Sequence, residues 1–387
     1  MTSPLFIAAA LCLFVVVSEW LVRTTFLRHI GTALLVILVT ALAANLGVVP
    51  AGSTADQPVA VYDGIFAVVA PLAIFLLLIP VNLRDIAFAG AGMVGLFTLG
   101  SLGTAVGVIL GMWLIGGPAG IGEDFRAVAG MFTGIYTGGS VNFNTVALEY
   151  EVVRDGVLYA GAIVVDNIVT TIWMIATLAI PRVLYRFWPG GRPTAGSASS
   201  GEPELGIETD TESLHPMDLG LTLGVGLFCV YLSEVLSDLW TAIPSAIYLT
   251  VIALALGQSP WADRLKGVRT LGMFTVYLFL AVIGAFCDVR AMGELGTLGV
   301  SLLIFTSVAV LIHGVITFGG ARLLRIDPDI AAVASQANVG GGTSALAVAR
   351  SLGREDLVLP GILVGSLGYA VGTFLGFAVA EYGLFMF

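Results

Sequence analysis

Charged residues are scarce in this chain of 387 residues: Asp, Glu, Lys and Arg together make up 11%, whereas soluble domains carry roughly 25%. Lysine is almost absent: the chain has one lysine, Lys266, and fifteen arginines. These few cations form no basic patch, which argues against a nucleic-acid partner. The net charge of −10 comes mainly from acids in loops and in one polar stretch, so it does not identify a ligand.

Cysteine and histidine are also rare, with three of each. Cys12, Cys229 and Cys287 fall inside apolar runs at irregular spacing, as small buried side chains do and metal ligands do not. The sequence shows no Ser-His-Asp set, no metal-ligand cluster and no phosphate-binding loop. We therefore expect no enzymatic activity, no metal centre and no cofactor, with Na⁺ as the one inorganic ligand to consider.

Apolar sequence dominates instead, with 58% hydrophobic residues and a mean hydropathy of +1.00. Runs of about 20 apolar residues indicate membrane spans. Ten runs predict an all-α, multi-pass integral protein of a cell membrane (plasma or inner), in contact with the lipid bilayer. The predicted spans are residues 5–22, 30–49, 61–80, 93–117, 157–181, 217–236, 243–258, 268–287, 294–318 and 358–386. The first run lacks the basic start and cleavage site of a signal peptide, so we expect it to be retained.

A polar stretch at 186–215, rich in Pro, Gly, Ser and Glu, divides the chain into halves 1–185 and 216–387. Each half holds five predicted spans and one segment broken by glycines, at 126–150 and at 328–352. Further short patterns recur in the same order, such as Ser-Glu in the first and sixth spans. This order predicts a duplicated architecture.

The two broken segments decide the predicted topology. If both dip into the membrane and return, 13 basic residues fall on one face and 3 on the other; if both cross, the numbers are 7 and 9. Cytoplasmic loops carry the excess of basic residues. We therefore predict re-entrant segments, outside N- and C-termini, a cytoplasmic linker, and two inverted repeats whose hairpins enter from opposite faces.

The glycine-rich tips are the predicted substrate site. Glycine lets a ligand approach the backbone, and the N-terminus of the half-helix that follows favours an anion. The predicted substrate-binding residues are Gly138, Gly139, Ser140 and Asn142 in the first half, and Gly341, Gly342, Thr343 and Ser344 in the second. The alternative is that these small residues serve only close helix packing.

Asp166 lies well inside the fifth predicted span, where a carboxylate by default marks an ion or proton path. The predicted ion-coupling residues are Asp166, Asn167, Asn144, Gln336 and Asn338, because Na⁺ prefers oxygen ligands. An internal contact is the alternative for each. His313 could relay protons or be a hydrogen-bonded packing residue.

Four runs carry a resemblance to a known family: TGGSVN at 137–142, VDN at 165–167, SQANVGG at 335–341 and LPGILVGSLGYAVGT at 359–373. They resemble the YjcL-like family, whose function is unassigned. That family is similar to a wider group of sodium/glutamate, sodium/citrate and bile-acid symporters and cation/proton antiporters. The likeness implies two inverted five-span repeats, a scaffold of spans 1–3 and 6–8, a mobile elevator-type core with both hairpins, and a homodimer. At the corresponding position the antiporters carry two acids or an Asn-Asp pair, whereas this chain has the single acid Asp166.

The sequence thus favours a secondary transporter that couples Na⁺ or H⁺ to symport of a small organic anion, namely an amino acid, a dicarboxylate or a small peptide. A cation/proton antiporter that uses Asp166 is the alternative. A membrane receptor or scaffold without transport is the third hypothesis.

Overall fold

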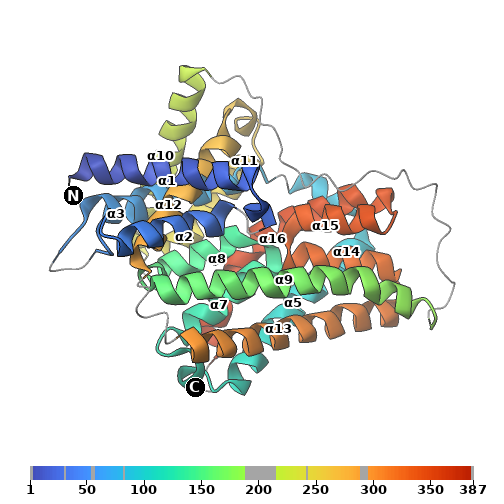
Figure 1. The fold of residues 1–387 in the computed structure, drawn as a ribbon. Coiled ribbons are helices and arrows are strands. Elements are labelled where there is room, and N and C mark those ends of the chain that lie inside the picture. Colours follow the sequence, from blue (N-terminus) through green and yellow to red (C-terminus); the bar gives the residue numbers. More distant parts are fainter. Residues whose placement is uncertain are drawn as a thin grey trace.

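The computed structural model describes residues 3–29, 32–53, 57–81, 83–187, 215–240, 243–287 and 295–384, and within these ranges all regular structure is helical (Figure 1). The α-helices are Pro4–Thr24 (α1), Thr32–Asn45 (α2), Ala60–Gly64 (α3), Ala70–Leu78 (α4), Ala91–Leu114 (α5), Pro118–Ile121 (α6), Phe125–Gly138 (α7), Ser140–Glu149 (α8), Gly156–Leu184 (α9), Pro216–Leu239 (α10), Ser245–Gly257 (α11), Val268–Phe286 (α12), Leu295–Leu324 (α13), Pro328–Val339 (α14), Gly341–Ser351 (α15) and Val358–Ala378 (α16). Short 3₁₀ or π turns cover Phe26–His29 (η1), Ile65–Val69 (η2), Arg84–Ala89 (η3), Val152–Arg154 (η4), Ala262–Arg264 (η5), Glu355–Leu357 (η7) and Val379–Gly383 (η8). The predicted linker 186–215 lies almost entirely outside the described residues.

Eight of the described helical segments are long and apolar enough to cross a membrane, with α3, η2 and α4 forming one of them. The predicted spans 30–49 and 243–258 are shorter than expected, because α2 has 14 residues and α11 has 13. Helices of that length extend about 20 Å, less than the hydrocarbon core of about 30 Å. Turn-forming residues set these limits: α2 is followed by Gly47 in the left-handed region and by Pro50, and α11 lies between Pro244 and Pro260.

The helices form two groups (Figure 1). In the flanking group (α1–α4 and α10–α12), α12 packs on α2 and α4, and α11 packs on α10 and α4. In the hairpin group (α5–α9 and α13–α16), α5 packs on α13, and α16 lies along α7 and α15. The groups meet where α9 contacts α12, α4 contacts α8, and α11 contacts α16. Most side chains of the largest apolar cluster come from the hairpin group.

The first broken segment is a helical hairpin. Its break is at Gly139, whose φ of 105° lies in a region that side chains disfavour. A Cβ on Gly134 would lie 3.0 Å from the Cβ of Asn142, and a Cβ on Gly130 would lie 3.1 Å from Val146. Residues four and eight positions before Gly138 therefore neighbour those four and eight positions after it, so α8 folds back antiparallel along α7.

The second broken segment has the same form. Helix α14 ends at Val339, and α15 begins after Gly340, with Gly341 at a φ of 78°. The two helices pack along each other, and Val333 of α14 and Ala345 of α15 both lie beside Gly361 of α16. We call α7–α8 hairpin 1 and α14–α15 hairpin 2.

The open ends of the two hairpins lie at opposite ends of α9. Hairpin 1 leads through η4 directly into Gly156, the first residue of α9. At the other end, the hydroxyl of Tyr185 hydrogen-bonds Asp327, which precedes hairpin 2. Since α9 has 29 residues, about 44 Å at 1.5 Å per residue separate these ends. The two hairpins thus enter the helical group from opposite directions.

Glycines of α16 bring both hairpins onto one helix. Gly361 and Gly365 pack on hairpin 2, Gly368 packs on the tip of hairpin 1, and Gly372 and Gly376 pack on its two arms. The spacing of four, three, four and four residues places all five on one face. A Cβ on Gly368 would overlap the backbone of Gly138 and Thr137. Such small-residue faces allow the close van der Waals contact that drives helix association in lipid.

We predict that Gly368→Ala destabilises the folded protein, because the added methyl group meets backbone that has no room to move. A decrease of about 1–3 kcal/mol in unfolding free energy is expected for this degree of overpacking. Thermal unfolding of the purified protein in detergent measures it. Gly224→Ala in α10 is the matched control, because nothing lies within 4 Å of the added atom. Equal melting temperatures for the two variants would contradict the prediction.

Candidate functional site

The tips of the two hairpins meet inside the hairpin group. The Nδ2 atom of Asn338, near the end of α14, donates to the Thr137 carbonyl at 3.1 Å and to the Ser101 hydroxyl at 2.9 Å. The entering arms α7 and α14 therefore end side by side. Because a helix C-terminus carries a partial negative charge, their meeting point is suited to a cation.

The predicted substrate residues of hairpin 1 have different surroundings. Ser140 is exposed at the start of α8, directly after the break. Asn142 is buried: its Nδ2 donates to the carbonyls of Gly134 at 3.3 Å and Gly368 at 3.1 Å, and its Oδ1 accepts from Thr373 at 2.8 Å. Asn142 thus joins both arms of hairpin 1 to α16, and Ser140 is the side chain left open to a solute.

In hairpin 2, Gly341 and Gly342 form the start of α15, where Gly342 touches Gly365 of α16. Ser344 donates to the Gly341 carbonyl at 3.0 Å, while Thr343 is exposed. Each hairpin therefore presents one exposed hydroxyl residue in the first turn of its returning helix.

Polar side chains follow one face of α9 and connect it to both hairpins. Tyr159 hydrogen-bonds Asn144 of hairpin 1, and Asp166 lies beside Tyr136 of hairpin 1. Further along, Trp173 donates to Ser335 at 3.0 Å and Thr177 donates to Gln336 at 3.3 Å, both in hairpin 2. These α9 residues, spaced seven, seven and four apart, share one helix face.

Asp166 is surrounded by hydroxyl groups rather than by the amides that the sequence suggested. Thr170 donates to Asp166 Oδ1 at 3.1 Å, and the buried Tyr136 hydroxyl approaches Asp166 and Thr306 without completing a hydrogen bond to either. Asn167 instead faces outward and donates to the Ile163 carbonyl at 2.9 Å. The structure thus brings the predicted ion-coupling residues to different places on α8, α9 and α14.

His313 belongs to a closed hydrogen-bond network between α5, α13 and hairpin 2. Its Nδ1 lies 2.8 Å from the Gly100 carbonyl, which can only accept, so Nδ1 carries the proton. Its Nε2 then accepts from Ser335 at 2.8 Å, and Ser335 accepts in turn from Trp173. These contacts fit a neutral imidazole that positions hairpin 2.

Several buried polar atoms near the hairpin tips make no hydrogen bond within the described part of the chain. They are the Tyr136 hydroxyl, Thr137 Oγ1, Gln336 Nε2 and Asn338 Oδ1, which all belong to the last turns of α7 and α14. Buried polar atoms are normally paired, so a cluster of exceptions needs an explanation. A polar ligand or ion at the meeting point of the tips would supply the missing partners.

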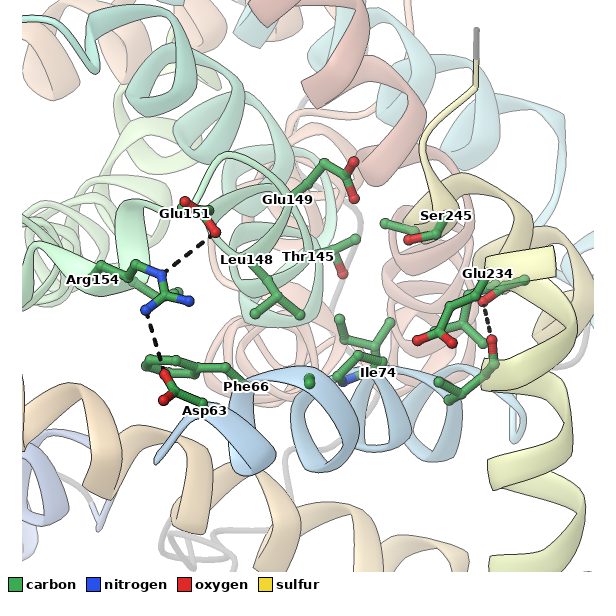
Figure 2. A pocket seen from close by; sticks show the side chains of 17 residues that line it. Asp63, Phe66, Ile74, Thr145, Leu148, Glu149, Glu151, Arg154, Glu234 and Ser245 are labelled. Carbon is green, nitrogen blue, oxygen red and sulfur yellow. Dashed lines mark hydrogen bonds and ion pairs between the residues drawn. The ribbon is translucent and has the colours of Figure 1, made fainter. Parts of the chain in front are cut away.

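A cavity of about 330 Å³ lies between hairpin 1 and the flanking group (Figure 2). Asp63, Glu149, Glu151 and Glu234 contribute carboxylates to it, and among the described lining residues only Arg154 is basic. Arg154 lies 3.6 Å from Asp63 and 3.5 Å from Glu151, so one cation is shared by two acids. The cavity is therefore net acidic. A second, narrow pocket continues along α4 and α8 to Asn144 and Val141, next to the tip.

The open end of hairpin 2 is closed by ion pairs. Arg354 contacts Asp327 at 2.6 Å, Asp329 at 3.3 Å and Asp356 at 2.8 Å. Hydrogen bonds to Asp356 and Asp327 raise the pKa of the Arg354 guanidinium further above its already high usual value. Arg354 is thus a permanent cation that ties the residues before α14 to those after α15.

Sequence reasoning missed the hydroxyl groups around Asp166, the Trp173–Ser335–His313 contacts and the role of the α16 glycines. Two signals could have found part of this. The α9 residues Asp166, Thr170, Trp173 and Thr177 repeat at helical spacing, and so do the α16 glycines. The partners on other helices follow no local pattern.

A family described as "Protein of unknown function (DUF819)" matches residues 5–386. The chain belongs to this family. It is also similar to the "Uncharacterized membrane protein YjcL" of Bacillus subtilis (strain 168), with 28% identity over 352 residues that cover 86% of this chain and 84% of that protein. The resemblance to the YjcL-like family is confirmed, and the chain is a multi-span membrane protein of the DUF819 family.

We predict that the open ends of the hairpins are accessible from opposite sides of the membrane, because they lie at opposite ends of α9. In a cysteine-free background, Glu123→Cys, before α7, and Glu355→Cys, after α15, place single thiols at exposed positions. A membrane-impermeant maleimide added to right-side-out and inverted vesicles should label each variant in one orientation only, and not the same one. Labelling of both from one side would contradict the arrangement.

Proposed function

We propose that this DUF819 protein is a secondary active transporter that uses the two hairpins as gates. The observation that supports it best is the meeting of two oppositely directed helical hairpins at tips that carry unpaired buried polar atoms. Broken helices that meet inside a membrane bundle are typical of carrier binding sites. The proposal includes inverted repeats, outside termini, a cytoplasmic linker, a location in the cell membrane and a homodimer.

The division into two helix groups supports an elevator-type motion. The hairpin group is tied together internally by the α16 glycines, the α9 polar face and the Arg354 ion pairs. Between the groups, Arg154 of η4 pairs with Asp63 of α3 at an exposed edge, and Cys287 after α12 donates to the Gly156 carbonyl of α9 at 2.9 Å. The contacts of hairpin 1 with α4 are largely apolar. Contacts of this kind permit the shear-type sliding by which packed domains change access.

Two features of the hairpin surroundings support a narrower solute class within this proposal. A carboxylate fits the first turns of α8 and α15, where Ser140 and Thr343 are exposed and helix N-termini attract anions. A solute with two carboxylates would be repelled by the acidic cavity beside hairpin 1. A small zwitterion, such as an amino acid or a short peptide, satisfies both regions because its ammonium group suits the carboxylates.

The second candidate is a cation/proton antiporter. The acidic cavity favours this function, since its excess of carboxylates concentrates cations at one face. In that case Asp166 would alternate between a cation and a proton, and no organic solute would be needed. A receptor or scaffold predicts no flux of either kind.

We predict that a zwitterionic ligand raises the melting temperature of the purified protein, and that Na⁺ increases this effect. Binding to the folded state stabilises by RT ln(1 + [L]/Kd), about 2.7 kcal/mol at a hundredfold excess over Kd. A thermal-shift screen of amino acids, dipeptides and dicarboxylates, with NaCl or choline chloride, measures it. Stabilisation by dicarboxylates alone would contradict the zwitterion proposal.

Transport in proteoliposomes should depend on Asp166 and Thr343. We expect Asp166→Asn and Thr343→Ala to lose solute uptake at least tenfold, because one removes the ion ligand and the other a solute contact, while membrane insertion stays normal. Thr171→Val on the outer face of α9 is the control. A Na⁺-driven pH change without any organic solute would instead establish the antiporter. Wild-type uptake by both site variants would refute the site.

A further inference from the structure

The side chains around Asp166 offer a set of oxygen atoms that could bind a particular ion. Two hydroxyl oxygens approach this carboxylate: Thr170 on α9 itself and Tyr136 in the last turn of α7. The hydroxyl of Thr306 on α13 lies beside that of Tyr136 and so adds a third oxygen to the same group. Tyr136 and Thr306 are fully buried. Oxygen atoms of this kind are the ligands of hard cations such as Na⁺.

The hydrogen-bond directions leave these oxygens free to bind a cation. Thr306 donates its proton to the Leu302 carbonyl at 2.7 Å, and Thr170 donates to Asp166, so both hydroxyls keep lone pairs that accept no bond in the described residues. The Tyr136 hydroxyl is buried without a completed hydrogen bond. A polar atom that is fully buried and unpaired is costly unless a ligand completes it.

The charge of the Asp166 carboxylate also favours a bound cation. No Lys or Arg of the described residues forms an ion pair with Asp166. A carboxylate inside a membrane bundle needs a compensating charge. Tyr136 lies in the last turn of α7, where the helix dipole adds partial negative charge. One carboxylate together with neutral oxygens suits a monovalent ion, because divalent sites gather several acids.

We propose that Asp166, Tyr136, Thr170 and Thr306 form a Na⁺ site at the contact of hairpin 1 with α9 and α13. The proposal rests on the proposed transport function and deepens it by naming the coupling ion and its ligands. It assigns no role in the ion site to Asn167, which faces outward. Hairpin 1 supplies Tyr136, so binding of Na⁺ holds the tip of this hairpin against α9.

The test is Na⁺ binding to the full-length purified protein, followed by thermal shift with NaCl against choline chloride at constant ionic strength and pH. The wild type should show a saturable rise in melting temperature. Tyr136→Phe and Thr306→Val should each raise the half-saturating Na⁺ concentration about tenfold, the effect expected from losing one oxygen ligand to a charged group. Asp166→Asn should abolish the response.

Matched controls separate loss of a ligand from general damage. Thr171→Val is the control for Thr306→Val, because it removes an exposed hydroxyl on α9 that bonds only the Asn167 carbonyl among the described residues. Tyr231→Phe removes an exposed hydroxyl on α10. Both controls should keep the wild-type response. Equal half-saturation in the wild type, Tyr136→Phe and Thr306→Val would overturn the site, as would a wild type that responds to pH but not to NaCl.

The site and the transport function fail separately. Selective Na⁺ binding that needs Tyr136 and Thr306, without flux of any solute or cation, would leave the site standing and refute the transporter. Solute uptake that is independent of Na⁺ and unchanged in Tyr136→Phe would leave the transporter standing and refute the site.

Discussion

The architecture depends on the contact between backbone and backbone where Gly368 of α16 meets Gly138 at the tip of hairpin 1. Lipid tails are as apolar as leucine, so inside a membrane this contact is stabilised by van der Waals packing rather than by the hydrophobic effect. It places the Gly368 carbonyl within reach of Asn142 and the Thr137 carbonyl within reach of Asn338. The hydrogen bond from Asn142 to the Gly368 carbonyl thus depends on a close approach that involves no side chain.

The sequence predicted what depends on local chemistry. Apolar runs located the helices, and Gly139 and Gly341 mark the breaks because glycine accepts backbone geometries that other residues resist. It could not predict which polar side chains face each other, because those pairs are set by tertiary packing. Asn142 was expected to bind a solute, yet it joins the arms of hairpin 1 to α16. Asp166 faces hairpin 1, whereas its neighbour Asn167 faces outward, because adjacent helix positions point about 100° apart.

The two hairpins differ in how firmly they are held. Hairpin 2 is fixed at its open end by Arg354 and along α14 by Ser335, which accepts from Trp173 and donates to a neutral His313. Hairpin 1 packs on α16 but reaches the flanking group through α8, where a cavity and apolar contacts lie between it and α4. A gate that opens to one side needs such an interface, since sliding breaks few hydrogen bonds there. The acidic cavity and the narrow pocket accordingly lie between hairpin 1 and the flanking group.

The proposed ion and solute are linked through net charge. In the proposed cycle, bound Na⁺ would neutralise Asp166 and a zwitterionic solute would add no net charge, so the loaded hairpin group would move without a buried uncompensated charge. With Asp166 ionised and empty, the same movement carries one negative charge through a medium in which charge is expensive and in which each elementary charge experiences about 2.3 kcal/mol per 100 mV. Movement without the ion is thus penalised by the residue that binds it. Because Tyr136 belongs to hairpin 1 and approaches Asp166 on α9, the proposed ion would also hold the tip closed beside the solute, so that coupling would follow from electrostatics and from shared geometry together.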